Sequence, residues 1–259
     1  MHTVVSRVKN ICGDSFYSAI IGSMSENETD LLLVGSEEIP LRQKLQSLSR
    51  LLEELVNEGS VIVKHEHRKY CHSDRIIHVL FYPSKRHLVE WELPSFVAYV
   101  NDRAIWISRS PVGLAFEYRN YRLREINAPR RSIIDIQFLS YQELACTYMI
   151  YAIAETNFVT TETLIENLLY VARFSITEYF VNQLDPDEPI EFWDWTEFLS
   201  YLSSIEEFRV LTELFKQLRN SELSLSRFYL SKMYIEFIVF LEERNLQSLI
   251  SCLKERIKC

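Results

Sequence analysis

The chain has 259 residues, of which 47% are hydrophobic and 13% aromatic, and its formal net charge is −8. This composition is typical of a folded globular protein and excludes a disordered chain, and the length suffices for one large or two ordinary domains. The negative charge argues against a protein whose whole surface binds nucleic acid, although a local basic patch is compatible with it. The absence of GxxxxGK[ST] and GxGxxG motifs argues against the P-loop and dinucleotide-binding classes.

The cysteines indicate a reducing compartment. There are five, they are scattered along the chain, and none forms a CxxC pair. This pattern favours thiols over a disulfide framework. The first residues have no long apolar core, and no apolar run approaches the roughly 18 residues that a membrane span needs. We therefore expect a soluble, cytoplasmic protein with no membrane partner.

The first 115 residues have the pattern of a sheet domain. Leucines recur at steps of four and three between Pro40 and Gly59, which predicts an amphipathic helix. Alternating and continuous apolar runs on both sides of this helix predict strands. In chain order the predicted elements are a helix over 4–12, strands over 16–22 and 30–35, the helix over 40–59, and strands over 60–65, 75–82 and 87–93.

A basic segment follows the sheet domain. A short helix over 95–100 and a strand over 104–108 lead into five arginines between Arg119 and Arg131, Arg122 among them, which alternate with tyrosines. We predict a linker over 116–135. Its arginines could bind a triphosphate, an RNA backbone or an acidic partner, or could simply be solvated.

Residues 136–259 have the pattern of an all-helical bundle. The fold class that we predict is therefore α+β, with a mixed-sheet domain over 1–115 followed by a helical domain. The helices predicted in the second domain span 141–155, 161–180, 191–204, 206–219, 224–244 and 246–257.

Two carboxylates at the start of the strand over 30–35 could hold a metal ion. Residues two apart on a strand point to one face, so Glu28 and Asp30 would project together. Transfer of a nucleotidyl group needs Mg²⁺ or Mn²⁺ on such carboxylates, and a third carboxylate usually comes from a neighbouring strand. On the predicted strand 87–93, Glu90 and Glu92 share a face, and either could be that third ligand.

Gly22-Ser23, a short loop and Glu28-Thr29-Asp30 leading into an apolar strand together resemble the signature of polymerase-β-type nucleotidyltransferases. The order of elements is also similar to that of kanamycin-type aminoglycoside nucleotidyltransferases. This resemblance implies that an NTP binds in the sheet domain near Gly22 and Ser23, with Arg119 and Arg122 as candidate phosphate ligands. The reaction implied is transfer of a nucleoside monophosphate to a small hydroxylated acceptor or a macromolecule.

The resemblance also implies a general base from a glutamate of the helical domain, for which Glu143 and Glu155 are candidates. The chain departs from the signature in two respects, because Glu28 replaces the usual Asp and the loop after Ser23 is short. The alternative is therefore a catalytically inactive protein of the same fold that acts as an interaction or nucleotide-sensing module.

Three further patterns are open to a functional interpretation. His65-Glu66-His67 with Cys71 and His72 could bind zinc, although no zinc-site spacing is present. Phe192-Trp193-Asp194-Trp195 could stack on a ligand, although aromatic residues at helical spacing are more often in a core. The arginines of the linker could bind RNA.

Overall fold

The computed structural model describes residues 2–21, 28–63, 76–92, 96–97, 100, 103–108, 133–154, 159–181, 195–220 and 225–257. Contacts within the chain group it into two compact units, residues 1–131 with 153–158 and residues 132–152 with 159–259. This division falls inside the predicted linker 116–135. Most of that linker lies outside the described residues, so the predicted domain boundaries stay a prediction.

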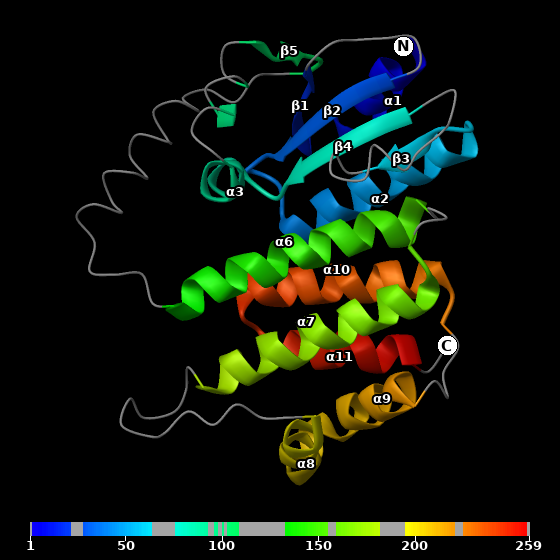
Figure 1. Cartoon of the computed structure of the whole chain (residues 1–259). Helices are drawn as coiled ribbons and strands as arrows, with labels where there is room; N and C mark the ends of the chain where they lie inside the picture. Colours follow the sequence, from blue (N-terminus) through cyan, green and yellow to red (C-terminus); the bar gives the residue numbers. More distant parts are fainter. Residues whose placement is uncertain are drawn as a thin grey trace, which may run out of the picture. The chain divides into compact units, whose positions relative to one another are not determined.

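The first unit is built on a five-stranded sheet with the strand order β3-β4-β2-β1-β5 (Figure 1). β2 pairs with β4 and β3 pairs with β4 in parallel, whereas β1 pairs antiparallel with both β2 and β5. The predicted mixed sheet and α+β class are therefore confirmed. The strands are β1 (Phe16–Ile21), β2 (Glu28–Gly35), β3 (Val61–Val63), β4 (Ile76–Tyr82) and β5 (Ile105–Trp106).

The helices α1 (His2–Cys12) and α2 (Leu41–Asn57) belong to the same unit as this sheet. The predicted leucine stripe of α2 is confirmed, since the side chains of Leu45, Leu48, Leu52 and Leu55 are fully buried. Burying each leucine contributes about 1.5–3 kcal/mol, so this stripe fixes α2 in the unit. Gly59 adopts a φ of 84° just after α2, a conformation that glycine tolerates best and that ends a helix.

The strand predicted over 87–93 is wrong, because residues Lys85–Trp91 form a helix, α3. Ser84 caps this helix, with its hydroxyl accepting a hydrogen bond from the backbone N–H of His87. Arg86 Nε donates to Glu90 Oε1 at 2.8 Å, a pair spaced by four residues as only a helix allows. The alternating pattern over 87–93 therefore predicted a strand wrongly, because Ser84 after Pro83 caps a helix there.

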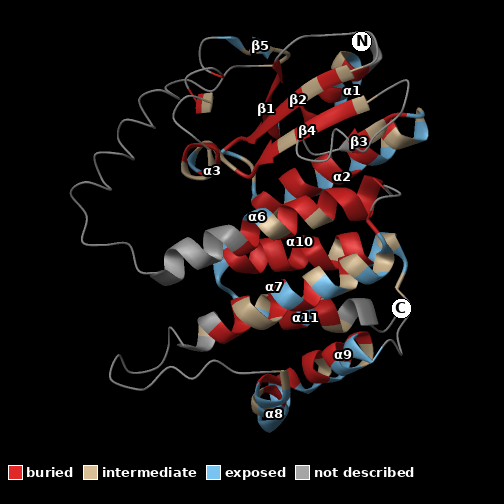
Figure 2. Ribbon diagram, viewed as in Figure 1, coloured by how far each residue is buried: buried red, intermediate tan, exposed pale blue. Residues whose placement is uncertain are grey.

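The second unit consists of helices, as predicted. Most of α10 is buried (Figure 2). The side chains of Tyr234, Phe237 and Phe240 on this helix are almost completely buried. The Tyr234 hydroxyl donates to the carbonyl of Leu164 at 2.6 Å, and burial raises the pKa of this phenol well above its usual value, so it stays neutral.

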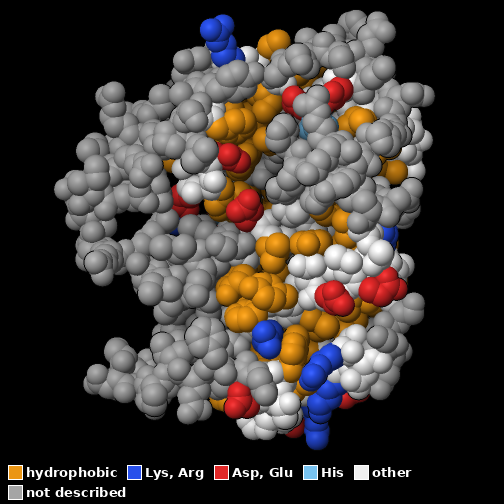
Figure 3. All heavy atoms as spheres, in the orientation of Figure 1, with side chains coloured by type: hydrophobic (Ala, Val, Ile, Leu, Met, Phe, Trp, Pro, Cys, Tyr) orange, Lys and Arg blue, Asp and Glu red, His pale blue; other side chains and the backbone are white. Residues whose placement is uncertain are grey.

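On the face in Figure 3, hydrophobic side chains lie next to Lys and Arg side chains over this unit. The helices are α6 (Ile133–Ala154), α7 (Thr161–Val181), α8 (Trp195–Ser204), α9 (Arg209–Arg219), α10 (Arg227–Glu243) and α11 (Leu246–Ile257), with a short 3-10 helix η2 (Glu206–Phe208) before α9.

Candidate metal centre

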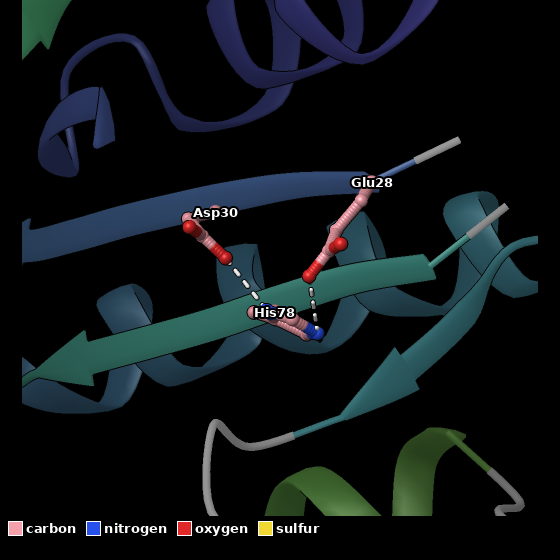
Figure 4. Close-up of side chains that lie close together, drawn as sticks. All are labelled: Glu28, Asp30 and His78. Atoms are coloured by element: carbon pink, nitrogen blue, oxygen red, sulfur yellow. Dashed lines mark hydrogen bonds and ion pairs between the residues drawn. The ribbon is translucent and has the colours of Figure 1, made fainter. Parts of the chain in front are cut away.

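Three side chains that can bind a metal ion meet where β2 and β4 begin. Glu28 and Asp30 lie on the same face of β2, as their spacing predicts. The parallel register places His78 of β4 directly opposite Asp30. Figure 4 shows the imidazole between the two carboxylates, with helix ribbons passing behind the strands on the other side of the sheet.

The imidazole contacts both carboxylates. His78 Nδ1 lies 2.6 Å from Asp30 Oδ1, and His78 Nε2 lies 3.5 Å from Glu28 Oε1. A carboxylate oxygen accepts a hydrogen bond, so Nδ1 carries the proton toward Asp30 and the ring orientation is fixed.

The site combines a buried imidazole with partly accessible carboxylates. The side chain of His78 has an exposed fraction of 0%, whereas those of Glu28 and Asp30 are 26% and 22% exposed. A buried ionisable group needs compensating partners, and the two carboxylates supply them. Within this cluster, the accessible surface therefore belongs to the carboxylates.

The rest of this sheet face is apolar. Leu32 and Val34 follow Asp30 on the same face of β2, and they belong to a buried cluster with Tyr82 of β4 and Leu88 of α3. Charged groups at the edge of such a cluster interact more strongly than in water, because the surrounding protein has a lower dielectric constant. The polar cluster is thus a local exception at the start of an otherwise hydrophobic face.

The three residues fit a divalent cation. Their ligand atoms all lie within 4.8 Å of one another, and no other group of three or more such residues occurs in the part of the chain that the structure describes. Ligands of one tetrahedral or octahedral ion lie within about 4 Å of one another, so small side-chain rotations suffice. Two carboxylates and one imidazole suit Mn²⁺ or Zn²⁺ better than Mg²⁺, which prefers oxygen ligands alone.

The predicted third carboxylate is not part of this cluster. Glu90 lies on α3 with its side chain 1% exposed, and it pairs with Arg86. Glu92 accepts a hydrogen bond from the Tyr82 hydroxyl at 2.5 Å, at the far end of β4 from His78. The strand prediction for 87–93 misplaced both residues, and His78 occupies the position expected for a third ligand.

The sequence contained one signal for His78 that the prediction did not use. His78 interrupts the apolar run Ile76–Leu80, and a polar side chain inside a buried strand needs a partner. The identity of that partner depends on the register between two strands that are 48 residues apart at Asp30 and His78, which no local spacing reveals.

Of the other predicted site residues, Glu143 lies exposed on α6. The remaining candidates fall outside the described residues, and their roles stay predictions. They are Gly22, Ser23, Arg119, Arg122 and Glu155, together with the histidine and cysteine pattern over 65–72.

Comparison of the chain with models of protein families, with curated proteins and with solved structures gives no match. None of the helices in the described ranges has both the length and the apolar run needed to cross a lipid bilayer. The class of the site, a candidate divalent-metal centre on a mixed sheet, therefore rests on its geometry.

Proposed function

We propose that the sheet unit is a nucleotidyltransferase-like unit, which holds a divalent cation on Glu28, Asp30 and His78 and binds an NTP beside it. The reaction is transfer of a nucleoside monophosphate to a hydroxyl group of a small molecule or a macromolecule in the cytoplasm. The meeting of two carboxylates and an imidazole on adjacent strands carries this proposal. When bound, the cation would neutralise phosphate charge and polarise the attacking hydroxyl.

The pairing register of β1 and β2 supports the proposed position of the nucleotide. Ile21, the last residue of β1, lies opposite Asp30 in the register, and Gly22-Ser23 follows it directly in the sequence. Glycine lets a backbone approach a phosphate closely, and a serine hydroxyl can donate to it. The end of β1, which the Gly-Ser dipeptide follows in the sequence, and the start of β2 with its carboxylates therefore lie at one end of the sheet.

One observation favours the alternative, a protein of this fold without catalytic activity. The two carboxylates already have a polar partner without any metal ion, because the imidazole lies between them. His78 has this position, with contacts of 2.6 Å to Asp30 and 3.5 Å to Glu28. Under this alternative, the sheet unit binds a nucleotide or a partner but does not transfer a nucleoside monophosphate.

Metal binding is the first test. Mn²⁺ is titrated by calorimetry into the full chain, into the double variant Glu28→Gln/Asp30→Asn and into Asp14→Asn, which changes an exposed aspartate beyond the other end of β1. We expect the double variant to bind Mn²⁺ at least about 10-fold more weakly, and Asp14→Asn to bind it as the native chain does. Equal binding by all three proteins, or no binding by the native chain, would overturn the metal centre.

Nucleotidyl transfer is the second test. ATP labelled in its α-phosphate is incubated with Mn²⁺, the protein and either an aminoglycoside or a mixture of short RNAs. Label that moves to an acceptor with the native chain but not with Glu28→Gln/Asp30→Asn supports the enzyme. Mn²⁺-dependent ATP binding without transfer to any of these acceptors supports the inactive alternative.

A further inference from the structure

The helical unit contains a cavity of about 550 Å³ that the metal centre does not use. Helices α7, α8 and α9 contribute to its wall, and Ile165, Leu169 and Leu218 give it an apolar part. This volume is in the range of small-molecule sites. The cavity includes Trp195, the last residue of the aromatic cluster that the sequence suggested as a stacking surface.

Two arginines converge on that tryptophan from different helices. The guanidinium carbon of Arg173 on α7 lies 5.3 Å from the Trp195 ring centroid, and that of Arg219 on α9 lies 5.8 Å from it. The two guanidinium groups are therefore no more than about 11 Å apart, which is the sum of these distances. Figure 3 shows Lys and Arg side chains next to hydrophobic side chains over this part of the unit.

Neither guanidinium has an acidic partner among the described residues. Arg173 and Arg219 make no ion pair within the described ranges, unlike Arg7, Arg50, Arg86 and Arg209. Two acidic residues of the cavity wall, Glu162 and Glu166, precede Arg173 on α7 by 11 and 7 residues, which corresponds to about 16 and 10 Å along a helix. Two cations are thus held near each other on one aromatic ring, and repulsion between them is relieved by an anion.

The cavity also presents an exposed aromatic surface. The side chain of Tyr170 lines it and is 44% exposed, although most large hydrophobic side chains of this unit are buried. Aromatic faces stack on planar rings, and each such contact with a nucleobase contributes about 1–3 kcal/mol. The two guanidinium groups can together bind the three oxygens of a terminal phosphate. A carboxylate ligand has only two oxygens and would use the two groups less fully.

We propose that this cavity binds an organic anion in which a phosphate group is attached to a planar ring system, of which a nucleoside monophosphate is a simple example. Arg173 and Arg219 hold the phosphate, and Trp195 and Tyr170 contact the ring. This site goes beyond the proposed nucleotidyl transfer, because it lies in the helical unit and requires no metal ion.

The test is a titration of AMP into the full chain with a chelator present, followed by calorimetry. We expect AMP to bind, and Arg173→Gln and Arg219→Gln each to weaken binding at least about 10-fold, since each removes charge-assisted hydrogen bonds. Lys232→Gln is the matched control, because Lys232 is another cation of this unit that lies over an aromatic ring, 5.0 Å from the centroid of Phe228. This variant should bind AMP as the native chain does.

Two further ligands and two further variants make the test specific. Adenosine and inorganic phosphate should each bind at least about 10-fold more weakly than AMP, since each lacks one half of the recognised group. Arg173→Lys keeps the charge but not the planar fork, so its affinity should lie between those of the native chain and Arg173→Gln. Glu28→Gln/Asp30→Asn should bind AMP normally, which separates this site from the metal centre.

The following binding results would overturn the proposal. They are no AMP binding by the native chain, equal binding by the double variant Arg173→Gln/Arg219→Gln, and adenosine or inorganic phosphate binding as tightly as AMP. Circular dichroism of each variant shows whether the helical content is retained. An AMP site that is lost in Glu28→Gln/Asp30→Asn would also contradict it, because the site would then belong to the sheet unit.

Discussion

At the scale of the single residue, His78 is the side chain that would set the ion preference of the proposed metal centre. It puts a nitrogen ligand where a carboxylate was expected, and its contact of 2.6 Å with Asp30 fixes the ring. Mg²⁺ prefers an all-oxygen set, whereas Mn²⁺ accepts an imidazole. In the metal centre that we propose, the preference among divalent ions is therefore set by one residue on β4.

The variant His78→Asp tests this assignment. A third carboxylate should raise the affinity for Mg²⁺ relative to Mn²⁺ by about 10-fold, measured by competitive calorimetric titration. His78→Asn is the control, because it keeps a polar side chain without adding charge and should weaken the binding of both ions. An unchanged ratio of the two affinities in His78→Asp would show that the imidazole is not a ligand.

Cys12 is a second residue with a testable property. Three described cysteines, Cys12, Cys146 and Cys252, carry thiols, as the sequence predicted. Burial raises the pKa of the Cys12 thiol from 9.0 to about 12. The folded state therefore keeps a proton that the unfolded chain loses, so this contribution to stability is fully present below pH 9.0 and decreases as the pH rises toward about 12.

Alkylation at about pH 8 should reveal this difference. We expect iodoacetamide to label Cys12 at least about 100-fold more slowly than a small-molecule thiol, because only the exposed thiolate reacts. The site of labelling is read by mass spectrometry, and unfolding in denaturant should abolish the protection. Rapid labelling of Cys12 in the folded protein would mean that the end of α1 opens readily.

At the scale of the element, the end of β2 is closely packed against the turn after β4. A Cβ atom on Gly35 would lie 2.1 Å from the carbonyl oxygen of Pro83. The same oxygen accepts a hydrogen bond from Lys44 Nζ of α2 at 2.6 Å. Three elements therefore meet where only glycine leaves enough space.

Gly35→Ala should destabilise the sheet unit by about 3 kcal/mol, because backbone atoms must move apart. Gly59→Ala is the matched comparison, since nothing lies within 4 Å of its Cβ position and only its φ of +84° opposes the change, at about 1 kcal/mol. Hydrogen exchange of peptides from β2 and β4 measures the free energy of opening. Similar values for the two variants would show that the end of β2 adapts to a methyl group.

At the scale of the whole molecule, the net charge of −8 governs the response to polyanions. Repulsion from the acidic surface opposes binding to an RNA backbone wherever no local basic patch acts. We expect affinity for a single-stranded RNA of mixed sequence to be weaker than about 10⁻⁶ M at physiological salt, and to fall steeply as salt increases. Fluorescence anisotropy at several salt concentrations measures both quantities, and tight binding with a shallow dependence on salt would contradict this expectation.

Local patterns in the sequence determined most of the elements and one half of the candidate site. The leucine period of α2, the strands β1, β2 and β4, and the helices of the second unit follow from residue spacing, because the geometry of a helix or strand repeats along the chain. The same rule placed Glu28 and Asp30 on one face. Only the tertiary structure added His78, since the parallel register of β2 and β4 depends on packing between distant segments. It also decided that Lys85–Trp91 is a helix, because the cap at Ser84 and burial of Leu88 and Val89 outweighed an alternating pattern.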